Sequence, residues 1–290
     1  MGLTNSAQRN ALAQYCVNMW SRYVAIGDSF SEGLDDLYED GGYRGWTDRL
    51  ADMLHDRNPD MEYANLAIRG RRTDRIVNEQ IPQALPQSPD LVSFASGIND
   101  LMGLNWDPAA TFADMERGLR ALRNSGADVL VIAFGDPKNR RGSISQWRSR
   151  FELLNRGTVA LAQQLGCFYL DFWPLSNYAD DVYWSEDRLH LSSLGHEITA
   201  LAAAEVLGLG DGAWRDEVHP LTGRRPAIAQ LPHDVRWVTK HAVPWAMRRV
   251  RGSSLGDGVG AKRPVLSSLT NNPLPRSMSS EDTNVDDYNA

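Results

Sequence analysis

Short apolar runs alternate with longer amphipathic segments between residues 22 and 209. The apolar runs predict five buried strands, and the amphipathic segments predict helices between and after them. The predicted strands are Arg22–Gly27, Glu62–Ala67, Leu91–Ala95, Asp128–Phe134 and Cys167–Phe172. The predicted helices are Arg44–His55, Thr73–Leu85, Pro108–Arg123, Ser145–Gly166 and Ser193–Leu207, with a kink or an end expected at Pro82.

The strands are continuously apolar rather than alternating, which is typical of strands that are buried on both faces. Strands separated by helices indicate βαβ units, a parallel sheet and helices on both of its faces. The pattern therefore predicts an α/β protein with a flavodoxin-like three-layer α/β/α sandwich and a five-stranded parallel sheet. If the strand order is 2-1-3-4-5, a ligand-binding crevice lies between the first and third strands.

The regular alternation of apolar and amphipathic segments ends after Gly210, where Pro and Gly become frequent. We expect an N-terminal extension (residues 1–20), the α/β domain (21–210), a C-terminal extension of helix and loop (211–251) and a disordered tail (252–290). The tail is rich in Gly, Ser, Asn and Pro, so it offers little apolar surface to offset its chain entropy. Met19 is a candidate alternative start, just before the first strand.

Residues 235–251 combine apolar and basic side chains around Pro244. Such a segment could bind a membrane surface, or it could pack against its own domain or a neighbouring subunit. We favour packing, which allows a homo-oligomer formed through this segment. Membrane insertion is not expected, because apolar stretches such as Asp128–Phe134 are far shorter than the ~18–20 residues that cross a bilayer.

Charge and cysteine content narrow the function classes further. The 290 residues carry a formal net charge of −7, and the pI near 5.4 argues against a nucleic-acid partner. The two cysteines show neither a disulfide framework nor metal-ligand spacing. Residues 1–18 lack the features of a signal peptide, so we expect a cytoplasmic protein.

Candidate chemistry begins where the first predicted strand ends, in Gly27-Asp28-Ser29-Phe30-Ser31-Glu32-Gly33. Ser29 lies at the carboxyl end of a buried strand, where open α/β sheets bind ligands. It is either a nucleophile or an ordinary N-cap of the following helix. Ser31 stands where the α/β-hydrolase elbow requires glycine, and no Gly-x-Gly-x-x-Gly supports nucleotide binding.

Three further segments lie at equivalent places in the fold. Asn65-Leu66-Ala67-Ile68-Arg69-Gly70 overlaps and follows the second strand, Ser96-Gly97-Ile98-Asn99-Asp100 follows the third, and Asp187-Arg188-Leu189-His190 precedes the last helix. Together with the Ser29 segment they resemble the four motif blocks of the GDSL or SGNH hydrolase family, over residues 22 to 209. The resemblance implies the same flavodoxin-like fold.

The resemblance also implies a role for each matching residue. Ser29 matches the family's nucleophile, His190 its general base, and Asp187 the carboxylate that orients the imidazole. The oxyanion hole would consist of the backbone N–H groups of Ser29 and Gly70 and the side-chain amide of Asn99. Asp28 and Asp100 also follow the family pattern, and we interpret them as supports of their loops.

Several neighbouring side chains remain ambiguous. Arg69, Arg71 and Arg72 surround Gly70, and they form either a solvated rim or an attraction for an anionic substrate. Trp184 either walls a substrate pocket or is a buried structural residue. Leu101, Met102 and Leu104 either line an acyl site or lead into a helix. His190 and His196 could pair around a metal, but no carboxylate cluster supports this, so no metal site is expected.

These observations predict a serine hydrolase that cleaves a small-molecule carboxylic ester through an acyl-enzyme, without a metal or an organic cofactor. A short-acyl esterase is preferred, because no extended apolar binding segment stands out. A lipase-like enzyme and a carbohydrate acetyl-esterase belong to the same prediction. The alternative is a non-catalytic module that binds a small ligand on the same fold.

Overall fold

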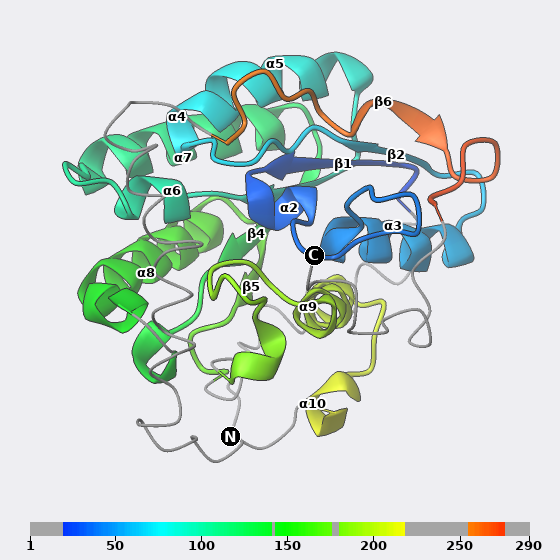
Figure 1. Cartoon of the computed structure of the whole chain (residues 1–290). Helices are drawn as coiled ribbons and strands as arrows, with labels where there is room; N and C mark the ends of the chain where they lie inside the picture. Colours follow the sequence, from blue (N-terminus) through cyan, green and yellow to red (C-terminus); the bar gives the residue numbers. More distant parts are fainter. Residues whose placement is uncertain (1–19, 141–142, 176–179, 218–254, 276–290) are drawn as a thin grey trace.

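A six-stranded sheet forms the centre of the computed structural model, which describes residues 20–140, 143–175, 180–217 and 255–275 (Figure 1). The strands lie in the order β5-β4-β3-β1-β2-β6. They are β1 Arg22–Gly27, β2 Glu62–Asn65, β3 Leu91–Ala95, β4 Asp128–Ala133, β5 Phe168–Asp171 and β6 Arg263–Ser268. The first five strands are parallel, as predicted, and they lie in the order 2-1-3-4-5 that we considered for the ligand crevice, but a sixth, antiparallel strand extends the predicted five-stranded sheet.

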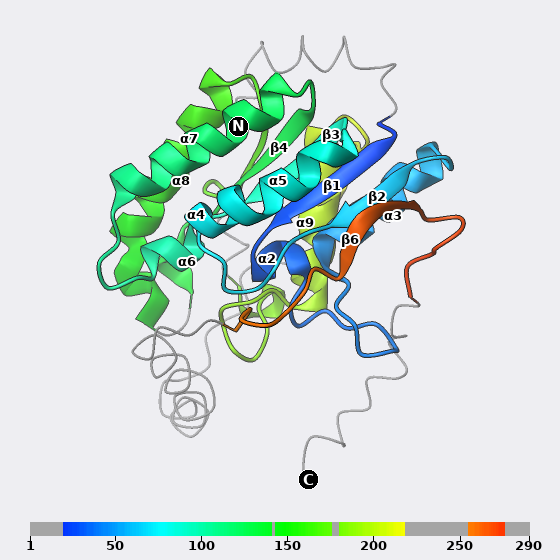
Figure 2. The same ribbon diagram turned by 90° about the horizontal axis from the view of Figure 1, so that it is seen from above.

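Helices cover both faces of the sheet, so the molecule has the three predicted layers (Figure 2). α3 and α9 pack together on one face, and α5, α7 and α8 lie on the other. The helices are α2 Ser29–Glu32, α3 Gly45–Arg57, α4 Thr73–Arg75, α5 Ile81–Ala84, α6 Ile98–Leu101, α7 Pro108–Asn124, α8 Arg148–Gln164, α9 Ser193–Val206 and α10 Trp214–Glu217. Short 3₁₀ turns are Leu85–Gln87, Pro137–Asn139, Ser143–Trp147 and Asp181–Tyr183.

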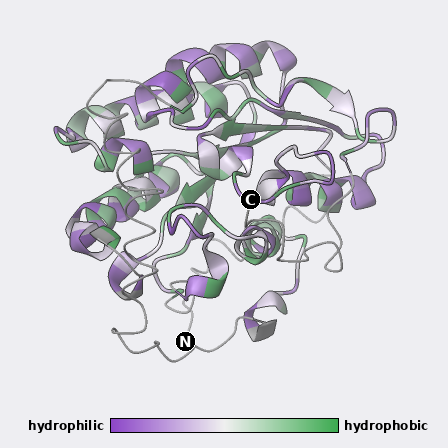
Figure 3. Cartoon of the chain, in the orientation of Figure 1, coloured by the Kyte–Doolittle hydropathy of each residue, from purple (hydrophilic) through white to green (hydrophobic). Residues whose placement is uncertain are grey.

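The core lies between the sheet and its two helical layers. All residues of β3 are buried, as are all but the first of β1. Helix α3 turns Trp46, Leu50 and Leu54 inward at four-residue spacing, and all three are buried. The central strands are mostly green and the outer helix surfaces largely purple in the hydropathy colouring, as expected for strands covered on both faces (Figure 3).

The helical segment around Pro82 continues past the proline. α4 runs into a π-helical turn (Ile76–Gln80), which runs into α5. Proline lacks an N–H and its ring crowds the preceding turn, so a wider turn before Pro82 lets the helix continue. The π turn also carries Gln80 to the end of β1, where its amide donates to Gly27 O and accepts from Gly27 N, both at 2.8 Å.

The sixth strand contradicts the predicted disorder of residues 252–290 over the described residues 255–275. β6 pairs antiparallel with β2 at the sheet edge, with a register irregularity between Tyr63 and Asn65. Lys262 fastens the segment that leads into β6, because its Nζ donates to the carbonyl oxygens of Tyr43 (2.9 Å) and Arg44 (2.7 Å). Composition did not predict this segment, because backbone pairing, the Lys262 hydrogen bonds and a few apolar side chains such as Leu269 are enough to hold it.

Other predictions about the chain ends fall largely outside the described residues. Residues 1–19 and the segment 235–251 are among them, so their predicted roles stay predictions. Trp20, the last residue of the predicted N-terminal extension, is buried in the core. Within the described part of the chain, no helix has the length and apolar character that crossing a membrane requires.

Candidate active site

Ser29 is the first residue of α2, directly beyond the carboxyl end of β1. The turn between them requires glycine at position 27, because a Cβ there would lie 2.6 Å from Ser31 Oγ and 2.7 Å from the Ala95 carbonyl oxygen. Asp28 caps the helix by accepting from Phe30 N at 3.0 Å. The hydroxyl of Ser29 is therefore held at the crevice between β1 and β3.

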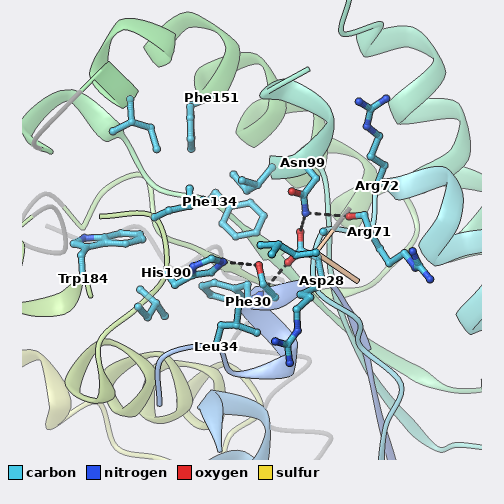
Figure 4. A pocket seen from close by; sticks show the side chains of 18 of the residues that line it. Asp28, Phe30, Leu34, Arg71, Arg72, Asn99, Phe134, Phe151, Trp184 and His190 are labelled. Atoms are coloured by element: carbon cyan, nitrogen blue, oxygen red, sulfur yellow. Dashed lines mark hydrogen bonds between the residues drawn. The ribbon is translucent and has the colours of Figure 1, made fainter. Parts of the chain in front are cut away.

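The loop before α9 brings two more predicted residues to Ser29. His190 Nε2 lies 2.9 Å from Ser29 Oγ, and His190 Nδ1 lies 2.6 Å from Asp187 Oδ2 (Figure 4). Asp187 Oδ1 accepts from the backbone N–H groups of Leu189 (2.8 Å) and His190 (2.9 Å), which closes the loop on itself. The structure thus joins Asp187, His190 and Ser29 in one hydrogen-bonded chain.

The electrostatics of this chain favour a defined proton arrangement. Burial disfavours the charged forms of both His190 and Asp187, but their mutual hydrogen bond and charge attraction outweigh it. As a result the pKa of His190 is raised and the pKa of Asp187 is lowered. When Asp187 is ionised and His190 neutral, the proton resides on Nδ1, and Nε2 can accept the Ser29 proton.

Asp35 and Ser185 join this network, although no sequence pattern pointed to them. Ser185 Oγ lies 2.7 Å from Asp187 Oδ1 and 2.6 Å from Asp35 Oδ2, and Asp35 Oδ2 lies 3.9 Å from His190 Nδ1. The ligand atoms of Asp35, Asp187 and His190 fall within 4.8 Å of one another, the one such group in the described residues. A cation there would compete with the Asp187–His190 hydrogen bond.

Two of the predicted oxyanion donors, the backbone N–H groups of Ser29 and Gly70, are available to a substrate. Within the described residues, no acceptor takes the N–H of Ser29 or of Gly70, and both residues line the same cavity. The side-chain amide of Asn99 is engaged, because Nδ2 donates to Asp28 Oδ2 at 2.8 Å and to Arg71 O at 3.1 Å (Figure 4). For Asn99 to serve an oxyanion, one of these bonds has to be shared or given up.

Carboxylates hold the loops around these donors, as we expected of the buried Asp28 and the partly buried Asp100. Burial raises the pKa of Asp28 to about 6, while Asn99 and the N–H of Phe30 donate to its carboxylate. Asp100 Oδ2 accepts from both N and Oγ1 of Thr73 at 3.0 Å, which ties α6 to the start of α4.

Glu32 is another buried carboxylate near these donors, and no pattern in the sequence singled it out. Its carboxylate accepts from the backbone N–H of Arg69 at 2.7 Å and also forms an ion pair with the Arg69 guanidinium. The available signal was its place inside the Ser29 motif, at the last position of α2. Glu32 therefore links the helix that carries Ser29 to the loop that carries Gly70.

A cavity of about 470 Å³ opens beside Ser29 and His190. Figure 4 shows Phe134, Phe151 and Trp184 on one side of it, and Arg71 and Arg72 on the other. Trp184 therefore lies at the pocket, under the guanidinium of Arg140, whose Cζ is 3.3 Å from the ring centroid. The two phenylalanines were not predicted as pocket residues, because in the sequence they resemble ordinary core residues.

Leu101, Met102 and Leu104 do not line this cavity. Leu101 is fully buried in the hydrophobic core, and Leu104 is 85% exposed. Met102 is partly buried against the same core. The approach to a helix, rather than an acyl site, accounts for these three residues.

The three arginines around Gly70 differ in their partners. Arg69 is paired with Glu32, and Arg71 lies 3.0 Å from Glu79 and 3.5 Å from Asp257. Among the described residues, Arg72 has no ion-pair partner. Most of the positive charge that the sequence places around Gly70 is thus balanced by carboxylates from elsewhere in the chain.

Comparison with known proteins gives consistent matches. The model of the GDSL-like lipase/acylhydrolase family matches residues 25–198. An arylesterase of Vibrio mimicus is 29% identical over 120 residues, which is 41% of this chain but only 56% of that protein.

Solved structures share the fold. An α/β hydrolase from the metagenome of Lake Arreo, Spain, has a TM-score of 0.56 at 18% identity, covering 66% of this chain and 97% of that one. An acetylxylan esterase of Geobacillus stearothermophilus has a TM-score of 0.54 at 16% identity, again covering 66% and 97%.

Proposed function

Because the chain belongs to the GDSL-like lipase/acylhydrolase family, we propose that it hydrolyses carboxylic esters through an acyl-enzyme on Ser29. The observation that carries the proposal is the hydrogen-bonded chain from Asp187 through His190 to Ser29, with distances of 2.6 and 2.9 Å. This hydrogen-bonded chain ends at a cavity that is also lined by Ser29 and Gly70, whose backbone N–H groups can serve as donors. A nucleophile, a base, an orienting carboxylate and oxyanion donors at one pocket are what acyl transfer requires.

In the proposed reaction, His190 Nε2 takes the proton of Ser29 as Oγ bonds to the ester carbonyl carbon. The carbonyl oxygen becomes an oxyanion and accepts from the N–H groups of Ser29 and Gly70, with Asn99 as a third donor. The C–O bond to the alcohol then breaks, and His190 returns the proton to the leaving oxygen. Water repeats the sequence on the acyl-enzyme, which releases the acid and restores Ser29.

The cavity supports a short acyl group or a small aryl ester as substrate. Its volume of about 470 Å³ lies toward the lower end of the ~300–1,000 Å³ typical of ligand pockets, and aromatic side chains line one side. An arylesterase and an acetylxylan esterase among the similar proteins agree with small acyl or aryl groups. A lipase-like substrate and a carbohydrate acetyl ester remain within the same proposal. An anionic substrate would depend on Arg72 more than on Arg69 or Arg71, because Arg72 is the one of these three that has no ion-pair partner among the described residues.

A fluorophosphonate probe tests the proposal, because its phosphonyl group labels activated serines. Intact-mass analysis should give a single adduct on the wild type, mapped to Ser29, and none on Ser29→Ala. Ser31→Ala is the matched control, since Ser31 lies on the same helix and its buried Oγ has no hydrogen-bond partner among the described residues. It should label as the wild type does and hydrolyse 4-nitrophenyl acetate at a similar rate.

The absence of an adduct on folded wild-type protein would contradict the proposal and favour the alternative of a non-catalytic ligand-binding module. A small-molecule ester is the partner that this proposal requires. The expected cytoplasmic location, and a homo-oligomer formed through residues 235–251, stay predictions.

A further inference from the structure

Residues 255–262, here called the C-terminal strap, lead into β6 from the side of the candidate active site. In both views the orange chain runs from β6 toward α4 and α2, near the end of β1 (Figures 1 and 2). Leu255 and Asp257 line the cavity that contains Ser29. The family match ends at residue 198, so the strap is an addition to the part of the chain that the family shares.

Gly256 of the strap lies directly on the backbone of the Gly70 loop. A Cβ at Gly256 would lie 2.2 Å from the carbonyl oxygen of Arg69 and 2.8 Å from Ile68 Cγ2. Only glycine allows so close an approach without movement of the loop. The Arg69 carbonyl and the Gly70 N–H belong to one planar peptide unit, so a contact that fixes the oxygen also fixes the direction of the N–H.

We infer that Gly256 is a positioning residue that holds the Arg69–Gly70 peptide with its N–H toward the reacting carbonyl. The inference rests on the proposed function, in which that N–H binds the oxyanion. Glu32 holds the preceding peptide unit, Ile68–Arg69, through its hydrogen bond from Arg69 N at 2.7 Å. The two peptide units that meet at Arg69 are therefore held by elements that are far apart in the sequence.

Asp257 adds a second contact on the far side of Gly70. Its carboxylate lies 3.5 Å from Arg71 Nη1, and the Arg71 carbonyl oxygen accepts from Asn99 Nδ2. The residues before and after Gly70 are thus both contacted by the strap. Because Asp257 is about half exposed, solvent screening makes this ion pair the weaker of the two contacts.

Lys262 and β6 give the strap a fixed place from which to act. Lys262 Nζ lies 2.7 to 2.9 Å from three oxygens, which belong to Tyr43, Arg44 and Asp48. Beyond it, Leu266 N donates to Gln87 Oε1 at 2.7 Å, in addition to the β2–β6 pairing. A strap anchored in this way can press on the Gly70 loop without being displaced by it.

The test compares two alanine substitutions in full-length protein. Gly256→Ala forces a methyl group against the Arg69 carbonyl, whereas Gly260→Ala places one where no heavy atom lies within 4 Å among the described residues. Neither glycine has a left-handed φ, so the two differ only in what the methyl group meets. Active sites are titrated with the fluorophosphonate, and kcat and KM are measured on 4-nitrophenyl acetate.

For Gly256→Ala we expect kcat per titrated site to fall about tenfold with KM within about twofold, because one oxyanion donor is turned away but not removed. Gly260→Ala should match the wild type. A merely structural role would lower the melting temperature and the number of titrated sites, but not kcat per site. An unchanged kcat for Gly256→Ala, beside a reactive wild type, overturns the inference and leaves the proposed function standing.

A wild type that neither labels nor hydrolyses the ester overturns the proposed function and the inference together. If Gly256→Ala does not fold, Lys262→Met takes its place, because it removes the strap's anchor on the carbonyl oxygens of Tyr43 and Arg44 and so loosens the Gly256 contact without adding a methyl group there. It should lower kcat per titrated site about threefold with KM within about twofold, and Lys262→Arg, which keeps the cationic donor, should restore the rate. Equal kcat per titrated site for the wild type and Lys262→Met would then overturn the inference.

Discussion

Two histidines six positions apart have opposite environments. His190 lies in the loop before α9, with Nδ1 facing Asp187 and Nε2 facing Ser29. His196 is in the first turn of α9 and is fully buried, with Nδ1 accepting from Trp46 N at 3.2 Å and Nε2 donating to Leu34 O at 3.1 Å. The considered metal pair of these two residues therefore has no geometric support.

These surroundings shift the pKa values of the two imidazoles in opposite directions. The carboxylate of Asp187 raises the pKa of His190 in spite of its burial. Burial lowers the pKa of His196 to about 4, and a protonated Nδ1 would also point at the N–H of Trp46. A histidine is thus a poised base or a neutral core residue according to whether its neighbours accept or donate.

The largest expected difference is in catalysis. His190→Ala should lower kcat on 4-nitrophenyl acetate by at least ~10⁴-fold, because the Ser29 hydroxyl loses its base. Its melting temperature should stay close to that of the wild type. Hydrolysis at near wild-type rate would contradict the assignment of His190, whatever the stability.

Removing His196 should affect stability instead. His196→Phe leaves the buried N–H of Trp46 and carbonyl of Leu34 unsatisfied, so we expect a loss of about 2–4 kcal/mol in the free energy of unfolding. Urea unfolding measures this loss, and kcat per titrated site should remain within about threefold of the wild type. A stable but inactive His196→Phe protein would contradict the assignment of His196 to stability rather than to catalysis.

The two histidines should also titrate in different pH ranges, and each should be seen in a different measurement. His190 must be neutral to act, so kcat/KM should rise with pH through a pKa above the usual 6.5. The neutral His196 contributes stability that is full above pH 6.5, where the unfolded state is also neutral, and is lost as pH falls toward about 4. Unfolding measured from pH 8 to 4.5 should show this acid loss, of up to about 3 kcal/mol, in the wild type and not in His196→Gln.

The smallest expected effect concerns Asp35. Its carboxylate is 3.9 Å from His190 Nδ1 but partly exposed, so Asp35→Asn should lower the midpoint of the pH–rate profile by only about half a pH unit. The rate at the plateau should change little. A much larger fall in the plateau rate of Asp35→Asn would mean that Asp35 shares the orienting role assigned to Asp187.

The fold was largely predictable, because its strands and helices follow local periodicity. β1, β3 and α7 begin and end within a residue of the predicted bounds. The family resemblance, drawn from four motif blocks, is confirmed by the match over residues 25–198. β6 was missed, since Arg263–Ser268 is short, contains Pro264 and is a strand only through its pairing with β2.

Within the candidate site, the residues that follow strands could be predicted and their supporting partners could not. Ser29, Gly70 and Asn99 lie at carboxyl ends of neighbouring parallel strands, where the topology itself brings them together. Glu32 could be seen only as part of the Ser29 motif, because nothing local shows that Arg69 folds against it. The expected charge of the Gly70 loop was overestimated for this reason.

The sequence by itself determined the layered α/β architecture, because this depends on local hydrophobic periodicity, and its four motif blocks, through the family resemblance, supplied the set of residues proposed for chemistry. Only the tertiary structure decided that His196 is buried between Trp46 and Leu34, that Asp35 lies near His190, and that Gly256 covers the Arg69 carbonyl. These contacts join segments far apart in the chain. Their distances and burial, which fix each pKa and each peptide orientation, exist only after the chain has folded.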